Sequence, residues 1–240
     1  MPNINALLLA GGLGTRLRPL TNTIPKCLVP IGGKPLLERW LDTLSQINCT
    51  RVLINKHYLA EQVDALLESV DYSEMNVQTI FEEQLLGTAG TLLKNKDFFD
   101  KSDVNLMIHA DNATDISLDE LITAHLNRAP GCILTMLTFN TDSPETCGIV
   151  KTDRQGIVVE FHEKKASPPG NCANGAIYAF DQDLLDVLSN LEDKPSDFST
   201  QILPMLVGRI QTCHTNSAFL DVGTIENLNR AQSLWADQSV

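Results

Sequence analysis

The chain starts with an apolar segment that stops at a pair of glycines. Residues 4–10 read Ile-Asn-Ala-Leu-Leu-Leu-Ala, and Gly11-Gly12 follow directly. A nearly continuous apolar run of this length is typical of a strand that is buried on both faces of a parallel sheet. The opening segment therefore favours an α/β fold.

Strand-like and helix-like segments alternate through the first half of the chain. Helical apolar spacing is present at 35–44 and 60–69, and strands are expected at 51–55, 77–81 and 104–109. This alternation predicts an α/β fold with a doubly wound, mostly parallel mixed sheet flanked by helices. Ligands bind beyond the carboxyl ends of the strands in such sheets. Since the first strand ends at Gly11 and the fourth at Asp111, we expect both to face the same rim.

The second half has a different pattern of expected strands and helices, although no linker divides the chain. A hairpin is expected from 148–153 and 157–161 around Arg154-Gln155-Gly156, followed by a strand at 176–180. Helices are expected at 183–191 and 224–235. We therefore predict a single domain over 1–240, in which the second half completes the fold.

Composition and charge narrow the kind of partner. The net charge of −12 argues against nucleic acid. Residues 1–37 nevertheless carry four basic residues and no acidic one, which leaves −16 for the other 203 residues. This local cationic segment indicates a small anionic ligand.

No apolar run approaches the roughly 18 residues of a membrane helix, so no membrane partner is expected. The six cysteines are scattered without metal-like spacing, which predicts reduced thiols and a cytoplasmic location.

A glycine-rich segment, Gly11 to Leu20, follows the first strand. Glycines let backbone N–H groups approach phosphate oxygens closely. The segment is neither a Walker A loop, because Thr15-Arg16 follow Gly14, nor a dinucleotide fingerprint, because the third glycine is missing. Taken alone, it is compatible with a phosphate-binding loop or with an ordinary tight turn.

The continuation of this segment is more specific. The residues GGLGTRLRPLT and PKCLVPIGGKP, within 11–35, resemble the signature of the sugar-1-phosphate nucleotidyltransferase family. The resemblance implies a Rossmann-like fold of the nucleotide-diphospho-sugar transferase type, with the loop around a nucleoside triphosphate. Arg16 would contact the β- and γ-phosphates, and Lys26 would bridge phosphates at the reacting centre, where charge builds up during the transfer. The residues implied to bind the nucleotide are Leu9, Ala10, Gly11, Gly12, Gly14, Thr15, Arg16, Glu82, Glu83, Gly87 and Thr88.

Two aspartates match the family's metal ligands. Asp111 follows an apolar strand, and Asp221 lies in Asp-Val-Gly-Thr. The resemblance implies that both hold Mg²⁺, which prefers oxygen ligands and shares them with phosphates, and that Asp111 belongs to the catalytic set with Arg16 and Lys26. The residue before Asp111 is Ala110, where the family usually has glycine. On the alternative interpretation, Asp221 caps the terminal helix and Asp111 caps a turn.

Further matches point to base and sugar recognition. Leu86-Gly87-Thr88-Ala89-Gly90 resembles the family's base-binding segment, and the acidic Glu82 and Glu83 before it resemble those of mannose-1-phosphate guanylyltransferases. Carboxylates accept hydrogen bonds, which suits the N–H donors of guanine. The residues implied to bind the sugar phosphate are Asn112, Gly148, Glu163, Lys164 and Asn174. The resemblance thus assigns about 1–145 to the nucleotide and about 146–240 to the sugar.

These matches predict a Mg²⁺-dependent enzyme that joins a nucleoside triphosphate to a sugar 1-phosphate, favouring guanylyl transfer to a mannose-like phosphate. Uridylyl or thymidylyl transfer to a glucose- or hexosamine-type phosphate is the first alternative. Phosphocholine as acceptor would call for an aromatic cage, and only 5% of the residues are aromatic. A non-catalytic nucleotide-sugar-binding regulatory protein is another alternative, and the oligomeric state stays open.

Overall fold

The structure, a computed structural model, describes residues 2–236. Its described residues form two compact units. Unit 1 consists of the described residues within Met1–Asn5, Leu86–Met107 and Ser117–Ser217. Unit 2 consists of the described residues within Ala6–Leu85, Ile108–Ile116 and Ala218–Val240. Strands β1 (Ile4–Leu9) and β6 (Val104–His109) have residues in both units.

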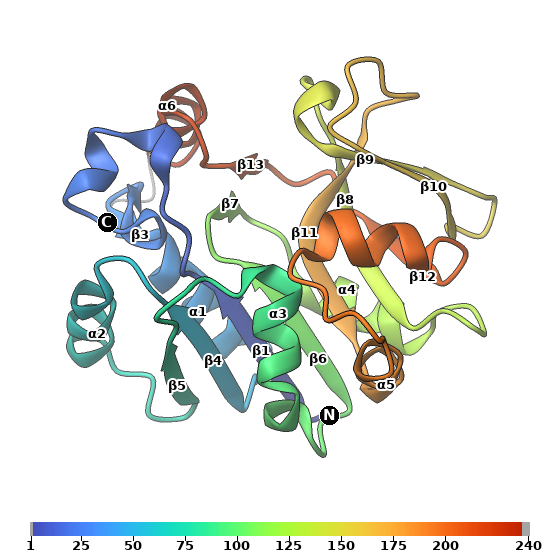
Figure 1. Cartoon of the computed structure of the whole chain (residues 1–240). Coiled ribbons are helices and arrows are strands. Elements are labelled where there is room, and N and C mark those ends of the chain that lie inside the picture. Colours follow the sequence, from blue (N-terminus) through green and yellow to red (C-terminus); the bar gives the residue numbers. More distant parts are fainter. Residues whose placement is uncertain (1, 237–240) are drawn as a thin grey trace. The chain divides into compact units, whose positions relative to one another are not determined.

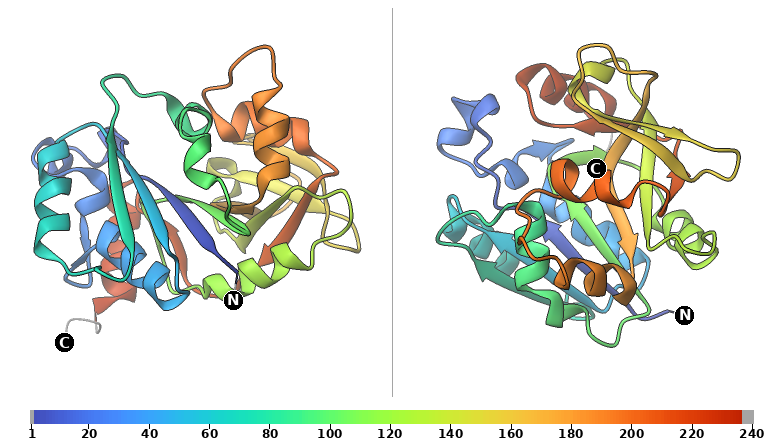
Figure 2. Two further views of the ribbon diagram at one scale, coloured as in Figure 1. Left: turned by 90° about the horizontal axis from the view of Figure 1, so that it is seen from below. Right: turned by 45° about the vertical axis from the view of Figure 1, so that its right-hand side comes forward.

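The strands of unit 2 contain the apolar segments at the start of the chain. The order is β1, then β4 (Arg51–Lys56), then β5 (Asn76–Phe81), and β4 and β5 run parallel. Leu7 and Leu8 are fully buried, as expected for a strand covered on both faces. Helix α1 (Leu36–Gln46) lies behind these strands and helix α2 (Ala60–Ser69) lies beyond β5 (Figures 1 and 2). Every strand and helix that we predicted in this unit's first 85 residues is present.

The rest of unit 2 consists of two short ladders and the last helix. Strands β2 (Pro30–Ile31) and β3 (Lys34–Pro35) form one ladder, and β7 (Asn112–Thr114) and β13 (Phe219–Asp221) form the other. Helix α6 (Ile225–Leu234) is capped by Thr224, whose hydroxyl accepts the Asn227 N–H at 3.2 Å. The core that joins these elements consists of Ile31, Leu36, Ala113, Leu220, Val222, Ala231 and Trp235.

Unit 1 contains the mixed part of the sheet. Strands β9 (Gly148–Thr152) and β10 (Val158–Glu163) form the predicted hairpin, and β11 (Cys172–Phe180) pairs antiparallel with β8 (Leu134–Asn140). Strand β12 (Ile210–His214) runs parallel to β8. The helices of this unit are α3 (Gly87–Lys94), α4 (Leu118–Leu126) and α5 (Gln182–Ser189).

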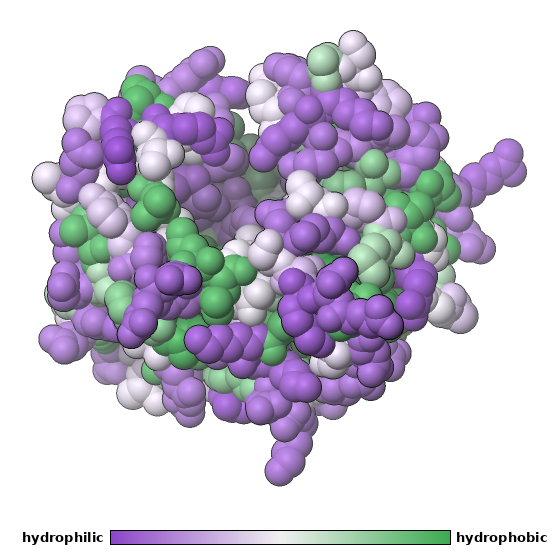
Figure 3. All heavy atoms as spheres, viewed as in Figure 1, coloured by the Kyte–Doolittle hydropathy of each residue, from purple (hydrophilic) through white to green (hydrophobic). Residues whose placement is uncertain are grey.

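The predicted fold class, a mixed sheet flanked by helices, is confirmed. Hydrophilic side chains cover most of the face in Figure 3, as expected for a chain with a net charge of −12, and apolar residues appear there as separate patches. Across residues 2–236, none of the helices has the length and apolar character needed to cross a membrane. The assignment of the nucleotide to 1–145 and of the sugar to 146–240 stays a prediction, and position 145 falls within unit 1.

Candidate active site

The glycine-rich segment of unit 2 is folded into short helical turns. Gly14 has a φ of 61°, in the left-handed region that favours glycine. A Cβ at this position would lie 3.0 Å from Cγ2 of Thr21 and 3.1 Å from Cβ of Lys26. The Gly14 carbonyl accepts the Leu17 N–H at 2.9 Å and the Thr21 hydroxyl at 2.7 Å. The glycine is therefore required both for the turn and for the close approach of Lys26.

Lys26 is the buried cation of this segment. Its side chain is 9% exposed, and its ammonium group donates to Oδ2 of Asp111 and, at 3.3 Å, to Oδ1 of Asp221. Burial lowers the pKa of Lys26, but the two carboxylates outweigh burial, so the pKa lies above its ordinary value. Lys26 is therefore charged when the protein is folded.

The two aspartates are 110 residues apart in the sequence and meet in unit 2. Asp111 immediately precedes β7, and Asp221 ends β13, where it pairs with Asn112 of β7. Burial raises the pKa of Asp111, but the nearby Lys26 and His109 outweigh burial and hold it below the ordinary value. The ladder between β7 and β13 thus brings both carboxylates to the same ammonium group.

Arg16 completes the charged cluster from the solvent side. Its side chain is 67% exposed, and Nη2 lies 3.9 Å from Oδ2 of Asp221. The cluster, defined as Arg16, Lys26, Asp111 and Asp221, therefore combines one fixed cation with one exposed cation and two carboxylates.

The alternative interpretation of Asp221 as a helix cap does not hold for its side chain. The cap of α6 is Thr224, and Asn227 donates its side-chain amide to the main-chain oxygen of Asp221 at 2.8 Å. Both carboxylate oxygens of Asp221 face Lys26 or Arg16 instead. Helix α6 thus holds the backbone of Asp221 and leaves its carboxylate for the cluster.

The cationic segment 1–37 is more nearly neutral in the fold than its sequence suggests. Lys34 Nζ lies 2.6 Å from Oδ2 of Asp42 and 3.5 Å from Oε1 of Glu38, both on helix α1. Lys26 is balanced by its two aspartates. Of the four basic residues that predicted an anionic ligand, Lys26, Lys34 and Arg16 therefore lie beside acidic side chains, and Arg16 is the most exposed of the three.

The donor set can be compared with what a metal ion needs. Within residues 2–236 there is no group of three or more His, Cys, Asp or Glu side chains arranged to hold a metal. The carboxylates of Asp111 and Asp221 both lie beside the Lys26 ammonium. In many Mg²⁺ sites one or two carboxylates bind the ion, and waters or phosphates complete its shell. Asp111 and Asp221 could therefore supply two oxygen ligands to a divalent ion, provided that ligands from outside these residues complete its shell.

A residue that was not predicted as part of the site connects the glycine-rich segment to Glu82 within unit 2. Asn55, the fifth residue of β4, is 4% exposed, and its side-chain oxygen accepts the N–H groups of Ala10 at 2.8 Å and Gly11 at 3.3 Å. Its amide donates to Oε1 of Glu82 at 3.3 Å. Glu82 is itself 2% exposed, whereas Glu83 is exposed. The only sequence signal was a polar residue at the end of an apolar strand.

Replacing Asn55 with leucine is expected to weaken the fold by about 1–3 kcal/mol, because two backbone donors and the Glu82 carboxylate lose a buried partner. Asn55→Asp keeps the acceptor for Ala10 and Gly11 but sets a second carboxylate beside Glu82, so it should not restore stability. Urea unfolding of both variants measures this. Asn76→Ala, at the exposed start of β5, should change stability by less than about 0.5 kcal/mol. An unchanged midpoint for Asn55→Leu would show that this contact does not hold the segment.

The remaining predicted nucleotide contacts lie in both units. Leu9 ends β1, and Ala10 donates its N–H to Asn55, whereas Gly12 and Thr15 are exposed or half-exposed on the turn. Gly87 and Thr88 start helix α3 of unit 1, where the Thr88 hydroxyl accepts the Phe198 N–H at 2.7 Å.

The predicted sugar contacts are grouped in unit 1, apart from Asn112, which is buried in β7. Gly148 pairs with Glu163 across the β9–β10 hairpin, and a Cβ at Gly148 would lie 2.6 Å from Oε2 of Glu163. Lys164 Nζ lies 3.4 Å from Oε1 of Glu163. Asn174 donates to the Tyr178 hydroxyl at 2.7 Å and accepts the Ala176 N–H at 2.9 Å, so it is held within β11.

Known proteins resemble the chain in sequence and in fold. Residues 5–238 match the nucleotidyl transferase family. The mannose-1-phosphate guanylyltransferase catalytic subunit beta of Drosophila melanogaster is 34% identical over 202 residues, which are 83% of this chain and 53% of that protein. The UTP–glucose-1-phosphate uridylyltransferase of Synechocystis is 30% identical over 217 residues, which are 85% of this chain and 55% of that protein.

A Bacillus anthracis protein solved in complex with a sucrose has a similar fold. It superimposes with a TM-score of 0.86 at 22% identity, and the match covers 98% of this chain and 96% of the other. At this identity the likeness concerns the fold alone. The chain spans about half the length of the curated relatives it matches.

Proposed function

The chain belongs to the nucleotidyl transferase family, and from this premise we propose that it joins a nucleoside triphosphate to a sugar 1-phosphate and releases pyrophosphate. The observation that carries the proposal is the buried Lys26 ammonium shared by Asp111 and Asp221 beside the glycine-rich turn. When two anions react, cationic side chains can stabilise the negative charge that builds up, and no nucleophilic side chain is required.

The proposed reaction is a displacement at the α-phosphorus. A phosphate oxygen of the sugar 1-phosphate bonds to the α-phosphorus, and the bond from that phosphorus to the bridging oxygen of pyrophosphate breaks. Lys26 is fixed by its aspartates and would neutralise charge at the reacting phosphates. Arg16 is exposed and forked, and it would bind the phosphates that leave. The N–H groups of the glycine-rich turn would orient the triphosphate.

We propose Mg²⁺ as the cofactor, held by Asp111 and Asp221. When bound, the ion would supply positive charge beside the phosphates. The Lys26 ammonium lies beside both carboxylates, and it lowers the pKa of Asp111, which favours the ionised form of that ligand.

The sugar phosphate is proposed to bind the hairpin and β11 of unit 1. Glu163 would accept hydrogen bonds from sugar hydroxyls, Lys164 would bind the phosphate, and Asn174 would contact the ring. The rigid holding of Asn174 by Tyr178 and Ala176 supports a fixed polar contact there. The lack of a side chain at Gly148 leaves the space that the Glu163 carboxylate occupies, and the Gly148 backbone would meet a sugar hydroxyl.

We favour guanine as the base and a mannose-like sugar. Glu82 and Glu83 supply carboxylate acceptors, and Asn55 fixes the first of them. The Drosophila relative is named as a mannose-1-phosphate guanylyltransferase and the Synechocystis relative as a uridylyltransferase, so uracil is the main alternative.

The test offers GTP, UTP and dTTP to the purified chain with mannose 1-phosphate or glucose 1-phosphate and measures pyrophosphate. We expect kcat/KM to favour GTP by at least about tenfold, because guanine offers two adjacent N–H donors to a carboxylate and uracil offers one. A preference for UTP or dTTP would reject guanine while leaving the transfer itself intact. Saturable nucleotide binding without pyrophosphate would instead favour a regulatory protein.

A further inference from the structure

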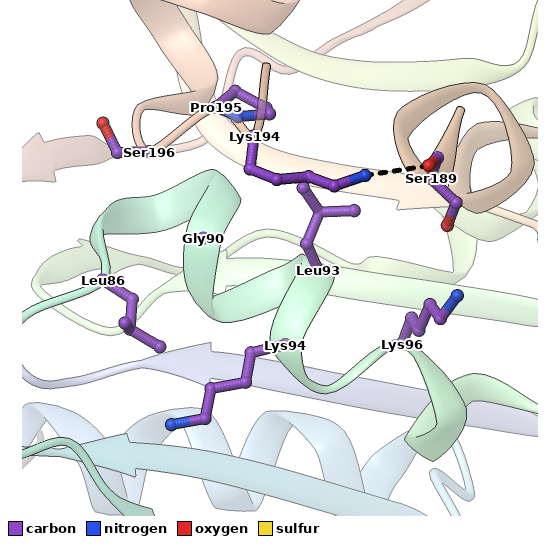
Figure 4. A pocket seen from close by; sticks show the side chains of 9 residues that line it. All are labelled: Leu86, Gly90, Leu93, Lys94, Lys96, Ser189, Lys194, Pro195 and Ser196. Carbon is purple, nitrogen blue, oxygen red and sulfur yellow. Dashed lines mark hydrogen bonds between the residues drawn. The ribbon is translucent and has the colours of Figure 1, made fainter. Parts of the chain in front are cut away.

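Unit 1 contains a cavity whose lining includes Leu86 and Gly90 of the predicted base-binding segment but none of the residues proposed to contact the nucleotide or the sugar phosphate. Its volume is about 500 Å³, and it lies between helix α3 and the segment that follows α5 (Figure 4). Pockets that hold small organic molecules usually measure about 300–1,000 Å³. Leu86, Leu93 and Pro195 supply its apolar wall. The size and lining suit the apolar part of a small molecule.

Lysines surround this apolar wall. Lys94, Lys96 and Lys194 line the cavity, and the described lining includes no Asp or Glu. Lys194 Nζ donates to the main-chain oxygens of Ser189 at 2.9 Å and Leu191 at 3.2 Å, so it stabilises the end of α5 (Figure 4). Lys94 and Lys96 are exposed, and among the described residues neither side chain has a hydrogen-bond or ion-pair partner. Two cations without partners thus flank an apolar cavity on a protein of net charge −12.

The same cavity touches the contacts that fix the first turn of α3. The Ser196 carbonyl accepts the N–H groups of Ala89 at 3.0 Å and Gly90 at 3.4 Å. These are N–H groups that a helix cannot satisfy internally. Ser196 and Gly90 both line the cavity. A molecule in the cavity therefore contacts both partners of this long-range helix cap.

We propose that this cavity binds an organic anion with an apolar body, and that binding stabilises the first turn of α3. The apolar body packs on Leu86, Leu93 and Pro195, and a phosphate, sulfonate or carboxylate meets Lys94 and Lys96. Inorganic phosphate alone is a poor ligand, because the described lining has no buried polar side chain that could bind it. Binding is independent of the transferase activity. Any effect on nucleotide affinity rests on the proposed function, since Gly87 and Thr88 of α3 belong to the proposed nucleotide site.

The probe for the test is anilinonaphthalene sulfonate, which carries a sulfonate on a fused aromatic body. It is titrated into the full chain by fluorescence, with excess GTP and Mg²⁺ present to keep it from the proposed nucleotide site. We expect saturable binding of one probe per chain. The double variant Lys94→Ala/Lys96→Ala should weaken binding about tenfold, because two charge-assisted contacts are lost. Both side chains are exposed, so the variant should fold.

The matched control is Lys101→Ala, an exposed lysine of unit 1 that does not line the cavity. It should leave the probe affinity unchanged. Equal weakening by the control would indicate general charge attraction and overturn the site, as would wild-type affinity in the double variant. Full competition by inorganic phosphate would overturn the role of the apolar wall.

Amide hydrogen exchange tests the effect on α3 without reference to catalysis. The amides of Ala89 and Gly90 should exchange more slowly with bound probe, because the Ser196 carbonyl then holds them more of the time. Unchanged exchange at saturating probe would refute the stabilisation of α3. Loss of pyrophosphate release with normal probe binding would concern the proposed function alone.

Discussion

Replacing Lys26 with alanine is expected to lower kcat for pyrophosphate release by about a thousandfold, the loss typical when a fixed charge-stabilising donor is removed from a transfer site. The ammonium is the one buried cation of the cluster, and two carboxylates hold it in place. Lys26→Arg retains the charge but replaces a compact ammonium by a larger planar fork at a buried position where Asp111 and Asp221 contact the ammonium. It should therefore restore little activity.

Lys34→Ala is the matched control for this variant. Lys34 belongs to the same signature segment, but it pairs with Glu38 and Asp42 of α1 and not with the cluster. It should lose at most about 1 kcal/mol of stability and keep most of its turnover, because surface ion pairs contribute little. Circular dichroism must show that Lys26→Ala is folded. If it is folded and turns over at the wild-type rate, the proposed role of Lys26 is wrong.

These two lysines differ in whether their ion-pair partners could be predicted from periodicity in the sequence. Both occur in the same signature, and both add to the positive charge of residues 1–37. The helix that follows Lys34 carries Glu38 and Asp42 one and two turns further on, so that pair is local. The partners of Lys26 are 85 and 195 residues away and depend on the ladder between β7 and β13. Periodicity in one sequence cannot reveal such pairings.

Helix α3 shows the same limit in the fold. The apolar strands and helices of the first half were predicted correctly because their periodicity is strong. Gly87–Lys94 contains two glycines and two threonines, which are weak helix formers. Its sequence therefore predicted a ligand-binding segment and not a helix. Its first turn is held by Ser196 and Phe198, more than 100 residues later. Tertiary contacts therefore decide this helix.

Asp221→Asn is expected to reduce turnover about a hundredfold at low Mg²⁺ and to shift the Mg²⁺ dependence of the remaining activity to higher concentration, because a neutral amide is a weaker ligand for a hard cation. The fold should tolerate the change. The backbone pairing with Asn112 and the main-chain contact from Asn227 do not involve the carboxylate. The Asp221 side chain is 51% exposed, so the amide that replaces the carboxylate remains in contact with solvent.

Asp111→Asn should be the more damaging of the two aspartate changes. Asp111 is the less exposed carboxylate, at 32%, and its loss leaves the buried Lys26 with Asp221 as its remaining carboxylate in the cluster. Both turnover and the free energy of unfolding should therefore fall, whereas Asp221→Asn should affect turnover alone. Mg²⁺ titrations of pyrophosphate release and urea unfolding of both variants separate these effects, with the exposed Asp119→Asn on α4 as control. Wild-type turnover after exhaustive chelation, or an unaltered Mg²⁺ dependence in both variants, would show that these carboxylates do not serve a divalent ion.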